Sequence, residues 1–239
     1  MAKIVQGMTI PGRFKKTGYT VYLRNGKPVS RPATSNQPKR RTRKQFVARQ
    51  QMLHSTRLWK ALKWAGTPMF PAQPTAYNRF LSLMHRTEVV FLPQNRPLDG
   101  ATLLLPEMPL SEGLLPTVKQ HLGEVDGNAA LITNLTRSSI HRDDNLILYT
   151  LTQDTKGKPR VWFKQREVIP EKMTETPEGL ALVSDEFADD MKGWALVHVR
   201  DERCSTQTAI TRCTYYQQFT TEEALQEAAA SYDGLTADV

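Results

Sequence analysis

The sequence is poor in cysteine, with only Cys204 and Cys213 among its 239 residues. Two cysteines cannot build the set of disulfides that holds a small secreted domain together, and their C-x8-C spacing matches no common zinc motif. We therefore expect two reduced thiols on a β-hairpin. Long apolar runs are missing too, since none approaches the roughly 18–20 residues that a membrane-spanning helix needs. The start of the chain has no apolar core like that of a secretory signal, so we expect synthesis in the cytoplasm and no membrane partner.

Motifs for common enzymatic chemistry are also missing. The sequence has no G-x-G-x-x-G, G-x-x-x-x-G-K-[ST] or H-E-x-x-H pattern, so we predict no cofactor and no metal. The stretch SSIHRDD, residues 138–144, brings serine, histidine and aspartate together, but it lacks the strained G-x-S-x-G turn of a serine nucleophile. We interpret it as a polar hairpin loop, and we interpret His198, in an apolar run, as a core histidine.

Acidic residues are almost absent from the first part of the chain. Residues 1–96 contain 19 Lys and Arg but one acid, Glu88, which gives a net charge of +18. Residues 97–239 contain 13 Lys and Arg and 23 acids, which gives −10. Such asymmetry predicts a basic region at 1–96 and an acidic region at 97–239 with different roles.

Local patterns predict the elements of the basic region. Asn25-Gly26 favours a tight turn between two short strands, and Pro28 indicates that the second strand lies at an edge. We expect the glycine-containing residues before this hairpin to form an extended arm. Helices are predicted at residues 42–66 and 75–86. Because the first helix lacks a clean apolar stripe, we expect it either to contact more than one surface or to be ordered only in an assembly.

The acidic region reads as short strands separated by turns, which is typical of an antiparallel β-sandwich. The runs VVFLP at 89–93 and ATLLLP at 101–106 are included among the expected strands. Near its end the chain predicts a short helix, in which Thr220 and Glu223 fit a capping box. The fold class is therefore α+β: an N-terminal hairpin or arm and two helices, followed by an antiparallel β-sandwich and a short C-terminal helix.

The basic residues are the candidate site, because lysine and arginine attract phosphates without sequence preference. Interleaved aromatic residues, Phe46 and Trp59 among them, suggest stacking on single-stranded bases. A solvated charge run, an acidic protein surface, or docking on the acidic half of a second copy are the alternatives. The candidate residues for binding nucleic acid or a subunit are Arg13, Lys15, Lys16, Arg31, Lys39, Arg40, Arg41, Arg43, Lys44 and Arg49.

The N-terminal pattern resembles an uncharacterised family found in Bacteroidetes genomes and in their phages and mobile elements. Members have a glycine-punctuated start, a short strand pair ending in arginine, and a helix with Gln-x-x-x-Arg. The resemblance implies a basic helical start, a C-terminal β-sandwich and no catalytic residues. The matching residues are Gly12, Gly18, Gly26, Arg31, Pro38, Thr42, Gln45 and Arg49.

Three functions are compatible with these features. The first is a non-enzymatic assembly protein of a bacteriophage virion, a head, connector or tail subunit made in the bacterial cytoplasm, with other virion subunits, copies of itself, DNA or RNA as partners. The second is a cellular nucleic-acid-binding protein. The third is an enzyme with an unrecognised site, for which His141 or Asp143 would have to matter.

Overall fold

The computed structural model divides the chain into two compact units, residues 1–40 and residues 41–239. This boundary differs from the boundary between the basic region, residues 1–96, and the acidic region, residues 97–239. Both predicted helices of the basic region therefore belong to the same compact unit as the acidic strands. The structure describes residues 12–14, 19–24, 27–32, 42–64, 70, 75–94, 103–154 and 160–232.

The first unit contains a three-stranded antiparallel sheet, in the order β1 (Gly12–Phe14), β2 (Tyr19–Arg24) and β3 (Lys27–Pro32). Arg24 lies opposite Lys27, which confirms the predicted hairpin. Strand β3 is at the edge, where a proline that cannot donate to a ladder is tolerated. The expectation of an extended arm is wrong for β1, because its three residues pair with β2.

The second unit combines α-helices with antiparallel sheets, as predicted for an α+β fold. Its described helices are α1 (Arg43–Trp64), α2 (Ala76–Met84) and α3 (Glu222–Ser231). Its described strands are β4 (Pro109–Ser111), β5 (Gln120–Val125), β6 (Asn128–Thr133), β7 (Asp144–Asp154), β8 (Arg160–Val168), β9 (Thr174–Thr176), β10 (Gly179–Val183), β11 (Lys192–Arg200), β12 (Arg203–Cys204), β13 (Gln207–Thr208) and β14 (Ile210–Thr211).

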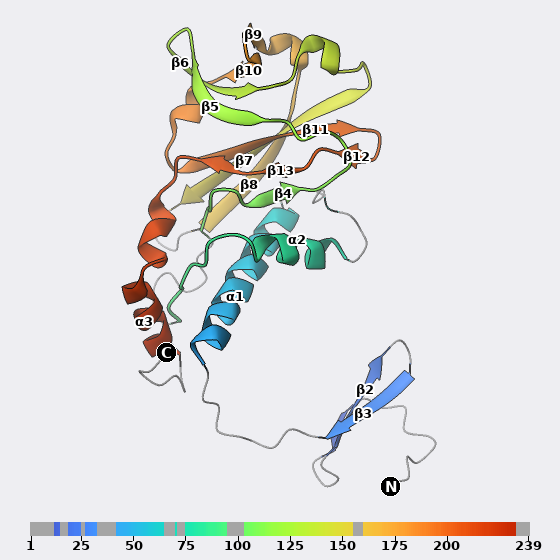
Figure 1. The fold of residues 1–239 in the computed structure, drawn as a ribbon, viewed down its shortest axis with the longest axis vertical. Coiled ribbons are helices and arrows are strands. Elements are labelled where there is room, and N and C mark those ends of the chain that lie inside the picture. The colour runs from blue at the N-terminus through green and yellow to red at the C-terminus, as the bar shows by residue number, and fades with distance from the viewer. Residues whose placement is uncertain are drawn as a thin grey trace. The chain divides into compact units, whose positions relative to one another are not determined.

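Two sheets are stacked, and helices α1 and α2 cover the outer face of the larger one (Figure 1). The smaller sheet has the order β5-β6-β10-β9; the larger has β12-β11-β7-β8, with β14 also paired to β11. Strand β11 is buried on both faces, as its apolar sequence predicts. Trp194 faces the core between the two sheets, and Ala195 faces the core under the helices. Strands β4 and β13 form a separate pair.

Helix α1 begins with a capping box, in which Thr42 Oγ1 accepts from the Gln45 N–H and Gln45 Oε1 accepts from the Thr42 N–H. Phe46 packs against α3, whereas Leu58 lies in the core beneath the larger sheet. The helix thus contacts more than one surface, which is the first of the two expected alternatives. Its buried face also contains polar residues such as His54, which explains why the sequence shows no clean apolar stripe.

The predicted strands at 89–93 and 101–106 are wrong, since the described residues of both segments belong to no ladder. Side chains bind their backbone instead. The Leu92 N–H donates to Gln50 Oε1 at 3.0 Å, and the Leu104 N–H donates to Gln153 Oε1 at 2.8 Å. Buried backbone groups must be paired, and here distant amides replace a neighbouring strand.

The predicted cap of the C-terminal helix is displaced by one residue. Thr221, not Thr220, is the N-cap, because its Oγ1 accepts from the Ala224 N–H at 3.2 Å. Thr220 instead closes the 3-10 helix η4 (Tyr215–Phe219) by donating to the Gln217 carbonyl. The existence of the helix is confirmed, and its start differs because two adjacent threonines were available.

Candidate functional site

The candidate basic residues are only partly described. Arg43, Lys44 and Arg49 lie in the first two turns of α1, and all three side chains are exposed. Arg13 and Arg31 lie in β1 and β3, where the structure describes the backbone. The remaining candidates fall outside the described residues: Lys15, Lys16, Lys39, Arg40 and Arg41.

One of the three described cations is neutralised within the chain. Arg43 Nη2 lies 2.5 Å from Glu222 Oε2 on α3, and both side chains are about half exposed. Such surface pairs contribute little to stability, typically about 0–1 kcal/mol. Within the described part of the chain, Lys44 and Arg49 have no ion pair. At the start of α1, the side chains of Lys44 and Arg49 are exposed.

The exposed face of α1 extends this basic surface beyond the candidate residues. Lys60 and Lys63 are both exposed, and the helix contains no acidic residue over its 22 positions. Sequence reasoning missed these two lysines because it searched for cations clustered along the chain. The helical period would have revealed them, since positions 49, 60 and 63 fall on one side of a helix with 3.6 residues per turn.

The suggested stacking role is wrong for Phe46 and stays a prediction for Trp59, whose side chain is partly exposed. Phe46 is buried and packs edge-on against Tyr232, with ring centroids 5.8 Å apart. Trp59 packs against Tyr77 and Phe80, at 5.7 and 5.3 Å. Both rings pack against the core of the second unit.

A polar cleft of about 400 Å³ lies between the loop that enters β7 and the end of β8. It is lined by Arg137, Ile140, His141, Arg142, Asp144, Asn145, Glu167, Val168, Ile169, Pro170 and Glu171. Four residues of the SSIHRDD stretch line this cleft: Ile140, His141, Arg142 and Asp144.

Both carboxylate oxygens of Asp144 accept hydrogen bonds from groups of the same chain. Arg200 donates to both of its carboxylate oxygens, at 2.5 and 2.9 Å, and the His141 N–H donates to Oδ2 at 2.8 Å. His198 Nε2 lies 2.8 Å from Oδ2, close enough for an ion pair although not aligned as a hydrogen bond. The Arg200 guanidinium holds the pKa of Asp144 far below its usual range, although burial of the carboxylate opposes this. His198 is confirmed as a buried core residue.

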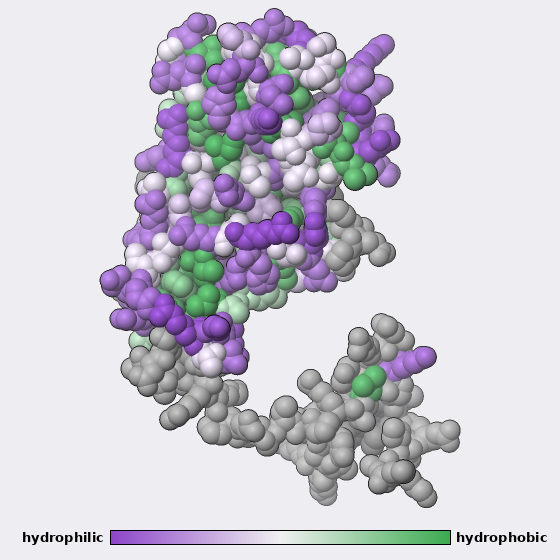
Figure 2. Space-filling view, viewed as in Figure 1, coloured by the Kyte–Doolittle hydropathy of each residue, from purple (hydrophilic) through white to green (hydrophobic). Residues whose placement is uncertain are grey.

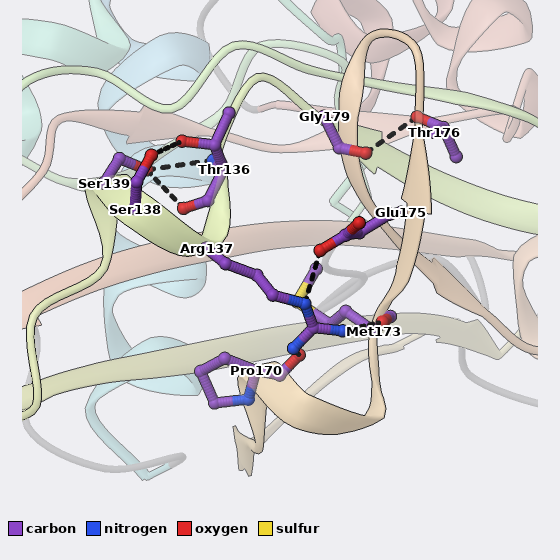
Figure 3. A network of polar contacts seen from close by, with 9 residues as sticks. All are labelled: Thr136, Arg137, Ser138, Ser139, Pro170, Met173, Glu175, Thr176 and Gly179. Carbon is purple, nitrogen blue, oxygen red and sulfur yellow. Dashed lines mark hydrogen bonds and ion pairs between the residues drawn. The ribbon is translucent and has the colours of Figure 1, made fainter.

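The serines of the stretch are also used locally. Ser139 Oγ donates to the Thr136 carbonyl at 2.7 Å, and the hydroxyls of Ser138 and Thr136 are 3.0 Å apart (Figure 3). In the described structure neither serine contacts His141. The stretch is not a hairpin loop, because β6 and β7, which it connects, belong to different sheets.

Arg137 links this crossover to the segment that follows β8, including Pro170, Met173 and Glu175 (Figure 3). Its Nε donates to Glu175 Oε1 at 2.6 Å and its Nη2 donates to the Met173 carbonyl at 3.2 Å. Its guanidinium is therefore engaged by groups of the same chain. Arg137 thus links the β6–β7 connection to β9, whereas Asp144 and Arg200 pair within the larger sheet.

Cys204 and Cys213 are free thiols, as expected from their number. Cys204 lies in β12, which forms a hairpin with β11, but Cys213 follows β14 and is not on that hairpin. Burial raises the pKa of both thiols, which lowers their reactivity at neutral pH.

The described residues contain neither a metal-binding cluster nor a membrane-spanning helix. No three histidine, cysteine, aspartate or glutamate side chains in this part of the chain are grouped to hold a metal ion. None of its helices is both long and apolar enough to cross a membrane. On one face of the molecule, hydrophilic side chains cover most of the described surface, with small apolar areas between them (Figure 2).

No family model, curated protein or solved structure matches this chain.

Proposed function

We propose that this chain is a non-enzymatic assembly protein of a bacteriophage virion, a head, connector or tail subunit. In this proposal its basic N-terminal portion binds neighbouring subunits or nucleic acid. The observation that carries the proposal is the exposed basic surface at the start of α1, where Lys44 and Arg49 have no ion pair among the described residues. These cations lie in a chain whose residues 97–239 have a net charge of −10.

The organisation of the chain supports an assembly role. Residues 1–40 form a compact unit of their own, and the sandwich with its helices forms another. A basic unit and an acidic region in one polypeptide have complementary potentials, which align and attract separate copies. The resemblance of the first fifty residues to a family found in phages supports the virion part of the proposal.

Mass photometry of the purified full chain tests the proposal. The protein is measured alone and mixed with structural proteins encoded by neighbouring genes, at about 50 and 300 mM KCl. We expect assemblies larger than the monomer, whose population falls at high salt because screening weakens charge pairing. The proposal would be contradicted if the protein stays monomeric at both KCl concentrations and forms no assembly with the structural proteins.

The second candidate is a cellular nucleic-acid-binding protein, which the acid-free surface of α1 favours. This second function predicts that the purified chain binds nucleic acid when no other protein is present. The distinguishing variant replaces five cations by glutamine and is measured with nucleic acid alone. Loss of binding without any particle formation by the wild type would favour this second function. The five replaced residues are Lys39, Arg40, Arg41, Arg43 and Lys44.

A further inference from the structure

We infer that Arg49, Lys60 and Lys63 form a phosphate-binding stripe along α1, which binds the backbone of a nucleic acid without reading its sequence. This inference rests on the proposed function and names the partner of its basic portion. It adds two lysines that lie well beyond the cluster at 39–49.

The three cations share one side of the helix. At 3.6 residues per turn they fall within about 60° of each other around the axis, and they span about 21 Å along it. Leu58 and Leu62, which are buried in the core, lie on the opposite side of the helix, and the side chains of Arg49, Lys60 and Lys63 are exposed. A duplex presents one phosphate charge per about 1.7 Å of its axis, so a stripe of this length can reach several phosphates.

The stripe is not neutralised by the described part of the chain. Helix α1 contains no acid, and neither Lys60 nor Lys63 forms an ion pair there. The acid on α3 that approaches α1 pairs with Arg43, which is on a different side of the helix. Lys63 also lies in the last turn, where the helix dipole favours a cation, but this does not apply to Arg49 or Lys60.

The character of the surface favours nucleic acid over an acidic protein. The core of a protein interface is depleted in charge and enriched in aromatic residues. On α1, the one large apolar side chain described as exposed is Met52, at 41%, and Trp59 packs inward against other rings. Binding to phosphates needs only positioned cations and no apolar anchor. The surface therefore has the cations that bind a phosphate backbone and lacks the apolar and aromatic anchors that a protein interface needs.

Fluorescence anisotropy of the full chain with labelled 25-base-pair DNA and a 25-nucleotide single strand, from about 50 to 200 mM KCl, tests the inference. In the variant Arg49→Gln/Lys60→Gln/Lys63→Gln, we expect the salt slope for duplex to fall by about 2 to 3, since each phosphate contact contributes about 0.9. Affinity at low salt should fall on the order of 10- to 100-fold. Circular dichroism checks that the variant is folded.

A matched control removes the same charge elsewhere, by Lys119→Gln/Lys164→Gln/Lys172→Gln. These lysines are exposed on the acidic region, and we expect wild-type affinity and slope. Equal losses in both variants would overturn the inference, as would wild-type binding in the stripe variant. If only the five-glutamine variant of residues 39–44 loses binding, the inference about the stripe is wrong and the cluster at 39–44 is the binding site. If wild type binds neither probe, the inference falls, and mass photometry decides the proposed function separately.

Discussion

His54 makes the stability of the fold depend on pH. Its side chain is buried, and Nε2 lies 3.1 Å from the Leu103 carbonyl. Burial lowers the pKa of His54 from 6.5 to about 4; the hydrogen bond to Leu103 opposes this shift, and the nearby Arg57 adds to it. In the folded protein the ring is therefore neutral at pH 6, and Nε2–H donates to the carbonyl.

The magnitude follows from the two pKa values. Between pH 6.5 and about 4 the unfolded chain binds a proton at His54 and the folded chain does not. The stabilisation is fully present above pH 6.5 and is lost as the pH falls through this window. A difference of about 2.5 pKa units corresponds to about 3 kcal/mol of unfolding free energy.

Urea unfolding followed by tryptophan fluorescence, at pH 7.5, 6.5, 5.5 and 4.5, measures this effect in wild type and in His54→Gln. Glutamine keeps an N–H donor near the Leu103 carbonyl but does not titrate. Other titrating groups are shared, so wild type should lose about 2.5 kcal/mol more unfolding free energy than the variant between pH 7.5 and 4.5. The exposed His121→Gln variant is the control and should follow wild type. Equal losses in His54→Gln and wild type would refute a neutral, buried His54.

Two further predictions concern the crossover and the last helix. Asp144→Asn should lower the free energy of unfolding by about 2–4 kcal/mol, because Arg200 loses the charge of its buried carboxylate partner. The control Asp143→Asn changes an exposed side chain and should alter the free energy of unfolding by less than about 0.5 kcal/mol. Equal effects in urea titrations would be inconsistent with the internal ion cluster. Thr221→Ala should lower the free energy of unfolding by about 1 kcal/mol, because it removes the N-cap of α3, and Thr220→Ala should lower it clearly less. A larger effect of Thr220→Ala in thermal unfolding would indicate that Thr220 is the N-cap, as the sequence predicts.

Elements with a strong local pattern were predictable. Strands β7 and β11, helix α2 and the β2–β3 hairpin carry their period or their turn residues in the sequence itself. The segment around Leu92 was mistaken for a strand because its backbone partner, Gln50, lies 42 residues earlier and leaves no local signal. Its apolar residues are needed by the core in either conformation, so composition alone could not separate the two.

The candidate site was predictable in charge but not in arrangement. The cation cluster is visible in the sequence, yet the pairing of Arg43 with Glu222 joins residues 179 positions apart. The helical period places Lys60 on the same side as Arg49, but that this side is exposed was known only from the structure. The orientation of α1 depends on polar residues, such as His54, facing the core, which a hydropathy pattern assigns to solvent.

The central claim is that the cations of residues 39–49 bind a partner outside their own chain. Co-sedimentation of the full chain with the structural proteins of the particle, at about 50 and 300 mM KCl, tests it most directly when wild type is compared with the five-glutamine variant. We predict that wild type enters the particle fraction at low salt and that the variant stays behind. Equal sedimentation of the two proteins at both salt concentrations would contradict the claim.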